Sequence, residues 1–171
     1  MQNWNNILET WRELPAKHIK RSKLKTDLSF QPRNAQAVGF KDRNKVKSES
    51  EEHAKLLAER LFICQDLDSI LVAEINGELF VIDGHHRLKA YKLVKRSDIP
   101  AKVYETDWDT AVIVSKLVNL DHRSLRMHKE QSREACWQFL AAVTDRGRHS
   151  HTETTSYRKL AAMFGVAPDT A

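Results

Sequence analysis

The stretch FVIDGHHRLKAYK joins an apolar, strand-like run to a sequence that favours a helix, and residues that can do chemistry stand at the join: Asp83, Gly84, His85, His86 and Arg87. A helix that begins here exposes unpaired backbone N–H groups and the positive end of its dipole, which attract anions. The glycine allows a close approach of the backbone to a phosphate, or a positive φ. The arginine offers a planar pair of donors for phosphate oxygens. The pattern therefore predicts a phosphate-binding site at a strand–helix junction.

The histidines and the aspartate add acid–base chemistry to this site. His85 or His86 can donate a hydrogen bond, carry positive charge or move a proton, and Asp83 can cap the helix or hold a divalent cation. For Asp83 alone an ordinary N-cap is the simpler interpretation, but the five residues together favour an anion site. Zinc is not expected, because adjacent histidines seldom ligate one ion and no Cys or His stands at a suitable spacing. Arg87 is expected to be exposed and to contribute little to the core.

The composition favours polyanionic partners. The 171 residues carry a formal charge of +5 with a pI of about 9.2, and cations gather in KHIKRSK, DHRSLRMHK and DRGRHSH. Any one of these basic segments could simply be a solvent-exposed surface. Three such segments in a chain with a net positive charge favour anion binding. No apolar run reaches the roughly 18 residues of a membrane helix, and the N-terminus lacks the pattern of a secretory signal. Cys64 and Cys136 match no metal spacing, so we expect a cytoplasmic protein with free thiols.

The periodicity predicts a mixture of α and β elements in the first two thirds of the chain and helices in the rest. The runs ILVAEI and ELFVI flank Asn76-Gly77, which is a strong signal for a β-hairpin. The polar segment 41–53 has no hydrophobic period and is predicted to be an exposed loop or flap. Helical patterns and one further strand, over 99–105, complete the prediction; the helices are expected over 4–14, 53–63, 85–95, 108–120, 124–147 and from 156 onward.

The stretch LVAEINGELFVIDGHHRLKAYK resembles the core of the ParB/sulfiredoxin superfamily. The D-G-H-x-R motif of ParB-like nucleases and kinases fits without exception. The G-E-R-R-x-R-A motif of partition ParB proteins is matched at Gly84, Arg87, Lys89 and Ala90. His85 and His86 replace its Glu and first Arg, and they stand where sulfiredoxin has its catalytic cysteine, so sulfiredoxin activity is not expected.

Two further segments resemble the same family. LSFQPRNA is similar to a Q-P-R segment in which the arginine reaches a nucleoside triphosphate, and it has Gln31 and Arg33 at those positions. VNLDHRSL is similar to an E-N-L-Q-R-x-x-L segment and matches it at Asn119, Leu120 and Leu125. The resemblance thus runs from about residue 30 to residue 125.

The resemblance implies an α+β fold: a ParB/sulfiredoxin-like domain over 1–110, with a small mixed sheet and flanking helices, and an all-α segment with a partial helix-turn-helix over 111–171. It implies catalytic roles for Asp83, His85 and His86. It implies a site for ATP or CTP, whose residues are Gln31, Arg33, Gly84, Arg87, Lys89 and Asn119. Mg²⁺ would be held by Asp83 and Asn119, because His85 and Val118 replace the acidic residues that hold it in partition ParB.

The final segment, TETTSYRKLAAMFGVAPDTA, resembles the opening of a helix-turn-helix. Leu160, Ala161 and Phe164 would lie on its first helix and Gly165 in the turn. The sequence ends where a recognition helix should extend, so a truncated or a degenerate motif is expected. DNA contacts should then be mostly non-specific contacts with phosphates.

Three functions are compatible with these features. The first is a ParB-like nucleotide- and DNA-binding protein with NTP hydrolysis, metal-dependent DNA cleavage or both, acting in the maintenance or transfer of plasmid or phage DNA. The alternative is a non-catalytic DNA-binding adaptor that regulates plasmid partition or conjugation, similar to small fertility-inhibition proteins. A small-molecule, serine-type kinase is less favoured because of the basic clusters. The expected partners are DNA, a nucleotide, a protein of partition or conjugation, and a second copy of the chain, but no membrane.

Overall fold

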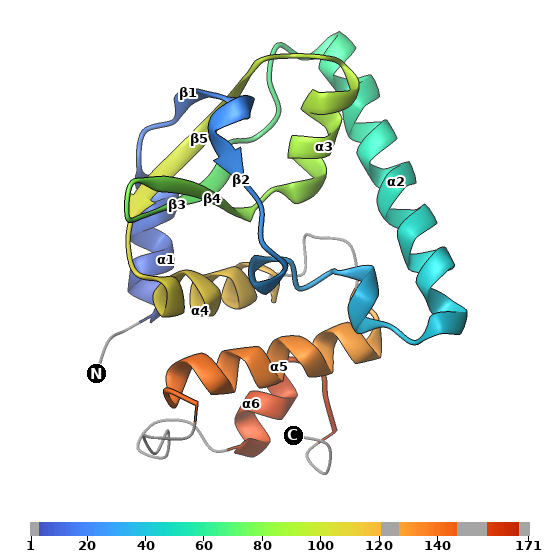
Figure 1. The fold of residues 1–171 in the computed structure, drawn as a ribbon, viewed down its shortest axis with the longest axis vertical. Coiled ribbons are helices and arrows are strands. Elements are labelled where there is room, and N and C mark those ends of the chain that lie inside the picture. The colour runs from blue at the N-terminus through green and yellow to red at the C-terminus, as the bar shows by residue number, and fades with distance from the viewer. Residues whose placement is uncertain (1–3, 121–126, 147–156, 168–171) are drawn as a thin grey trace.

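The computed structural model describes residues 4–120, 127–146 and 157–167, and it has the mixed α+β architecture that the sequence predicts (Figure 1). Five strands form one sheet in the order β1-β5-β3-β4-β2. The strands are β1 Lys17–Lys20, β2 Leu24–Lys25, β3 Ile70–Ile75, β4 Glu78–Asp83 and β5 Asp98–Glu105. The helices are α1 Trp4–Glu13, α2 Phe40–Ile63, α3 His85–Leu93, α4 Trp108–Val118, α5 Lys129–Val143 and α6 Tyr157–Met163, with short 3₁₀ turns η1 Arg21–Lys23, η2 Leu28–Phe30 and η3 Ala35–Ala37.

The predicted hairpin is the centre of the sheet. Strands β3 and β4 are antiparallel, and Asn76 and Gly77 between them have φ values of 52° and 78°, as a tight two-residue turn requires. Strand β5 runs parallel to β3 on the other side, β1 pairs with β5 in antiparallel fashion, and β2 is parallel to β4. The arrangement places the end of β4, and with it the motif that follows, next to the start of β3.

Strand β3 is buried on both faces, and its alternating side chains belong to two different cores. Leu71, Ala73 and Ile75 pack with α1 and α4, whereas Ile70 and Val72 pack with α2 and α3. A third cluster joins α4 to α5 and α6. The boundary predicted between residues 110 and 111 falls inside α4, which contributes side chains to the first and third clusters. The division into two domains therefore stays a prediction.

The prediction of a loop over 41–53 is wrong, because these residues form the first half of α2. The segment is rich in Lys, Glu and Arg, which favour a helix even where no apolar stripe is present. The buried positions of this helix come later, at Ala54, Ala58 and Leu61. The basic segment KHIKRSK contains an unpredicted edge strand, β1, and the whole of η1.

The helical tail is partly described. Helix α5 begins at Lys129, where His128 and Gln131 form a reciprocal capping box. Helix α6 is followed by Gly165 with φ of 64°, as predicted for the turn. The start of the predicted recognition helix, residues 168–171, and Leu125 of the third motif lie outside the described residues. None of the helices within the described ranges is both long and apolar enough to cross a membrane.

Candidate functional site

The junction between β4 and α3 depends on the backbone of Gly84. Its φ is 100°, a left-handed conformation that side chains with a Cβ rarely adopt. A Cβ at this residue would also overlap Cγ2 of Ile70 and lie 2.9 Å from its Cβ. Two roles are predicted for Gly84, a positive φ and a close approach of the backbone to a phosphate. The structure shows the positive φ, whereas Ile70 of β3 fills the space beside the glycine. The turn directs the first residues of α3 toward α2.

Arg87 is held by the protein itself. Its guanidinium donates to Oδ2 of Asp83 over 2.6 Å and to the backbone carbonyls of Asp68 and Ser69 over 2.9 Å and 2.7 Å. Its side chain is only 21% exposed. The expectation that Arg87 is exposed is therefore wrong: it ties α3 to the end of β4 and to the loop before β3. A phosphate would have to compete with three acceptors that are already in place.

His85 has a buried ring nitrogen for which the described residues supply no hydrogen-bond partner. This atom is Nε2, and the positive groups of Arg33, Arg87, Lys89 and Lys116 surround the ring. Burial, followed by these charges, lowers the pKa of His85 to about 3, so the ring is neutral at pH 7. A buried polar atom without a partner costs about 1–3 kcal/mol. The position is therefore suited to a ligand that supplies the missing hydrogen bond.

His86 connects α3 to α2. Its Nε2 lies 2.9 Å from Oγ of Ser50, and Lys89 Nζ donates to the same hydroxyl over 3.3 Å. The His53 ring lies edge-on at 5.1 Å between ring centres. Burial, and then the positive charges of His53, Lys89 and Arg33, lower the pKa of His86 to about 3. Because the ring is neutral, the Ser50 hydroxyl can donate to Nε2.

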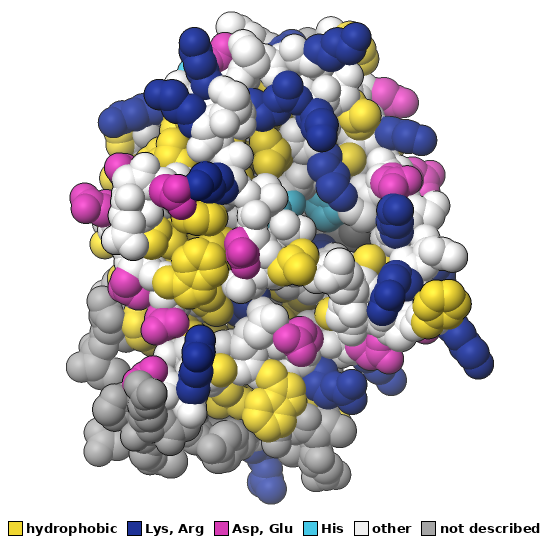
Figure 2. Space-filling view, viewed as in Figure 1, with side chains coloured by type: hydrophobic (Ala, Val, Ile, Leu, Met, Phe, Trp, Pro, Cys, Tyr) yellow, Lys and Arg dark blue, Asp and Glu magenta, His cyan; other side chains and the backbone are white. Residues whose placement is uncertain are grey.

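A cavity of about 250 Å³ lies where α2, the first turn of α3 and the start of α5 meet. On the face drawn in Figure 2, histidine side chains lie in a hollow near the middle, with Lys and Arg side chains above it. Most of the side chains that line the cavity are polar or charged: Arg33, Asp42, Lys45, Val46, Glu49, Ser50, His86, Met127, His128 and Gln131. Such a lining, with two cations and two carboxylates, suits a small, hydrogen-bonding ligand better than an apolar one.

The structure brings together two residues from the outer motifs and separates a third from them. Arg33 donates to Oδ1 of Asn119 although the two lie far apart in the sequence, and Asn119 in turn donates to Ser115 O over 2.7 Å. Burial lowers the pKa of Arg33, and the carboxylate of Asp83 partly opposes this. Gln31, predicted to bind the same nucleotide as Arg33, lines a different cavity of about 390 Å³ beside Glu134 and Gln138.

The two oxygens predicted to hold Mg²⁺ do not fit that role as arranged. Oδ2 of Asp83 accepts from Arg87, and Oδ1 of Asn119 accepts from Arg33. A metal ion at either oxygen would have to displace a guanidinium or lie beside its positive charge. Across the described parts of the chain, no group of three or more His, Cys, Asp or Glu side chains could hold a metal ion. We therefore derive no step through a metal held by this site.

Sequence reasoning missed three residues of the site. Ser50 was missed because its segment is predicted to be a loop, and His53, at the start of the helix predicted over 53–63, was not recognised as a site residue. Lys116 is fully buried, and its Nζ donates to the carbonyl of Ser29. Burial lowers the pKa of Lys116 to about 8, with the carboxylates of Glu134 and Asp27 opposing it. Its signal was readable, since it is the one cation in the otherwise apolar helix AVIVSKLV.

Comparisons with known proteins give a family for most of the chain. The family model of the ParB N-terminal domain matches residues 7–120. One similar solved structure is the C-terminally truncated chromosome-partitioning protein ParB from Caulobacter crescentus, complexed to the centromeric parS site. It is 17% identical to this chain, with a TM-score of 0.49, and the match covers 90% of this chain and 66% of that chain. The same protein complexed with CTP-γ-S is 12% identical with a TM-score of 0.38, covering 91% and 73%. This chain thus spans slightly less than two thirds of the first of these structures. No curated protein matches the sequence. The match over residues 7–120 shows that the chain belongs to the ParB N-terminal domain family.

Proposed function

We propose that this protein binds the phosphates of a nucleoside triphosphate, ATP or CTP, in the cavity between α2, α3 and α5, and that it binds DNA. Membership of the ParB N-terminal domain family supports both parts of the proposal. The setting we propose is the maintenance or transfer of plasmid or phage DNA, as the resemblance to small plasmid-borne fertility-inhibition proteins implies.

One observation carries the nucleotide part of the proposal: the cavity is lined by cationic and hydrogen-bonding side chains, Arg33, Lys45, Ser50 and His86 among them. The neighbouring His85, whose buried Nε2 has no partner among the described residues, lies behind this lining, and its ring is neutral. Cationic and hydrogen-bonding groups in one partly closed place are stabilised by a polyanion with several acceptor oxygens. Nucleotide phosphates have this chemistry.

The protein's own side chains then divide the work of binding. Arg33 and Lys45 face the cavity and supply positive charge, while Ser50 and His86 supply hydrogen bonds at its wall. Lys89, which donates to Ser50 from the α3 side, supplies a further positive charge for the phosphates. Arg87 acts indirectly, because it fixes Asp83 and the start of α3.

Binding without turnover is favoured over hydrolysis by the positions of the three candidate catalytic residues. Asp83 is engaged by Arg87, and His85 does not line the cavity. Only His86 faces the cavity, and as a neutral imidazole it can accept a proton from water but cannot donate one at pH 7. NTP hydrolysis would therefore depend on His86 as a base. Metal-dependent DNA cleavage is not proposed, because Asp83 and Asn119 do not fit a metal.

Titration calorimetry with ATP and with CTP, each with and without Mg²⁺, tests the nucleotide part. Binding of either nucleotide is expected, with a loss of at least tenfold in affinity in Arg33→Ala and no change in Lys41→Ala, whose side chain is exposed outside the cavity. Phosphate release measured with and without DNA separates turnover from binding, and His86→Ala should abolish any release. If neither nucleotide binds, the assignment of the cavity is wrong.

A further inference from the structure

Three segments that lie far apart in the sequence meet at the end of the molecule where α2 and α3 both terminate (Figure 1). The guanidinium of Arg96 donates to Leu61 O over 2.8 Å and also to the carbonyl of Gln65, so the end of α2 lies against the α3–β5 turn. The backbone N–H of Arg21 donates to Ser97 O over 2.7 Å. We call this region the apex; it consists of residues 20–23, 61–65 and 92–98.

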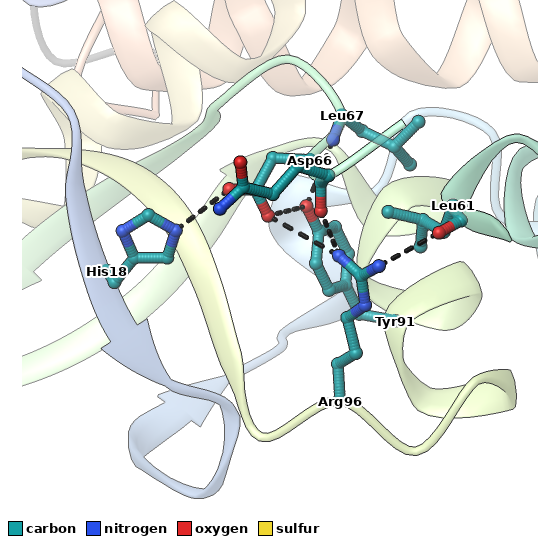
Figure 3. A network of polar contacts seen from close by, with 7 residues as sticks. His18, Leu61, Asp66, Leu67, Tyr91 and Arg96 are labelled. Atoms are coloured by element: carbon teal, nitrogen blue, oxygen red, sulfur yellow. Dashed lines mark hydrogen bonds and ion pairs between the residues drawn. The ribbon is translucent and has the colours of Figure 1, made fainter. Parts of the chain in front are cut away.

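A network of polar contacts fixes these segments relative to one another (Figure 3). Asp66 lies at its centre, with Oδ2 3.0 Å from Nε2 of His18 and Oδ1 accepting from the Tyr91 hydroxyl over 2.9 Å. Arg96 approaches the same carboxylate at 3.8 Å. Burial alone would raise the pKa of Asp66, but these hydrogen bonds and charges bring it below its usual value. The carboxylate is thus ionised and already compensated, so it leaves the other cations of the apex unneutralised.

The apex carries large apolar side chains that nothing in the described chain covers. Phe62 is 81% exposed and Ile63 is 87% exposed, and both lie between the two carbonyl groups that Arg96 binds. Leu93, at the end of α3, is 54% exposed. Single exposed apolar residues are ordinary on a protein surface. Two consecutive, almost fully exposed apolar side chains at a helix end favour contact with a partner that is itself apolar.

Besides Arg96, the segments of the apex also carry five cations. They come from β1 and η1 and from the end of α3: Lys20, Arg21, Lys23, Lys92 and Lys95. None of the five forms an ion pair with a carboxylate of residues 4–120, 127–146 or 157–167, in contrast to Lys25, which pairs with Glu78. Asp98, opposite Lys20 in the β1–β5 register, is the carboxylate set among them. The apex therefore has a marked positive charge.

Lys95 is a cation in an unusual backbone conformation. It has φ of 58° directly after α3, where its N–H donates to Lys92 O and the next N–H donates to Tyr91 O. Glycine or asparagine is preferred at such a position. The negative end of the helix dipole accounts for cations at Lys92 and Lys95. It does not account for those of β1 and η1, which belong to no α-helix.

We propose that the apex binds the surface of an anionic lipid membrane. In this arrangement Phe62 and Ile63 enter the boundary between headgroups and acyl chains, and the five cations contact lipid phosphates. A duplex of DNA would satisfy the cations but would leave the two projecting apolar side chains in water. The combination of apolar tips and unpaired cations therefore favours lipid over nucleic acid. The surface is separate from the cavity, so membrane contact does not depend on the proposed nucleotide site.

Co-sedimentation of the whole chain with vesicles tests this proposal. The protein is expected to bind phosphatidylglycerol vesicles, to bind phosphatidylcholine vesicles weakly, and to dissociate as salt is raised. Phe62→Ser with Ile63→Ser should lower the partition into phosphatidylglycerol vesicles by about tenfold or more. Lys92→Gln with Lys95→Gln should lower it and flatten its dependence on salt. These side chains are exposed, so circular dichroism should show unchanged folding.

Matched controls lie at the other end of the same helix. Phe40 is 84% exposed at the first position of α2, so Phe40→Ser removes a comparable apolar side chain and should leave vesicle binding unchanged. Lys41→Gln with Lys47→Gln removes the same charge as the cation variant and should have a smaller effect. No binding to phosphatidylglycerol vesicles, or equal losses in the Phe40 variant, would overturn the proposal. The proposal would also be overturned if the protein bound duplex DNA through the five cations and did not bind vesicles. The apex would then be a DNA-binding surface.

Discussion

The hydroxyl oxygen of Ser50 lies 2.9 Å from Nε2 of His86, and this contact joins the middle of α2 to the first turn of α3. Lys89 donates to the same hydroxyl from one turn further along α3. Both Ser50 and His86 line the cavity. Helix α2 is therefore a wall of the candidate site, and a change in its position would alter the site directly.

Ser50→Ala is expected to weaken nucleotide binding by about three- to tenfold, because it removes a hydrogen bond worth about 1 kcal/mol and leaves His86 and Lys89 without their shared partner. Ser48→Ala is the matched control, since Ser48 is exposed on the same helix and does not line the cavity. Titration calorimetry at pH 7 measures both variants. Equal affinities in the two variants would show that the Ser50 contact is only structural.

Gly84→Ala is expected to destabilise the fold by about 2 kcal/mol or more, because alanine must adopt a φ of 100° and its Cβ must displace Ile70. Gly77→Ala separates the two causes: Gly77 also has a positive φ, of 78°, but a Cβ there meets nothing within 4 Å. This control should cost about 1 kcal/mol. Urea denaturation measures both, and adding Ile70→Ala should recover part of the loss only in the Gly84 variant.

Arg87→Ala is expected to lower the free energy of unfolding by about 2 kcal/mol, since three acceptors in a partly buried place lose their donor. Lys89→Ala, two residues further along α3 at an exposed position, should change stability by less than about 0.5 kcal/mol. Denaturation midpoints compare the two variants. An Arg87 variant as stable as the parent would mean that its guanidinium is free for a ligand.

The hairpin and the motif junction were predictable because their signals are local. Asn76-Gly77 needs positive φ at both positions, and Gly84 follows a strand directly, so the turn chemistry alone specified the boundaries of β3, β4 and α3. The first half of α2 was not predictable by periodicity because it is almost wholly polar, whereas the second half, over 53–63, was predicted from the apolar residues that reach the core. Strand β1 was hidden for a similar reason, because an edge strand of four residues with three exposed side chains shows little apolar alternation.

The sequence predicted only some of the residues that form the site. A motif tells which residues are near in sequence, so Asp83 to Lys89 were found together, but it does not tell which way each side chain points. Arg87 turns toward Asp83 and the loop before β3, whereas His86 turns toward α2. Gln31 and Arg33, two residues apart, face different cavities for the same reason. These directions are set by contacts across the fold, which the sequence pattern does not contain.

Acid is expected to destabilise the fold through His85 and His86. The pKa of each is lowered from 6.5 to about 3, so between these two values the unfolded chain binds more protons than the folded protein. The free energy of unfolding therefore falls as the pH decreases through this window, by up to about 1.4 kcal/mol per pH unit for each histidine. Urea denaturation at about pH 7 and about pH 4.5 measures this, and His85→Gln with His86→Gln should flatten the dependence.

Nucleotide binding is expected to be coupled to proton uptake. The positive charges around His85 and His86 contribute to their low pKa values, after burial. A bound triphosphate offsets those charges and raises both pKa values, so the complex binds more protons than the free protein, and affinity increases as the pH falls toward 6. Calorimetry in two buffers with different ionisation enthalpies measures the uptake. His86→Gln should reduce it, while Ser48→Ala should leave it unchanged. An affinity that does not vary with pH, with no uptake of protons, would place the phosphates away from these histidines.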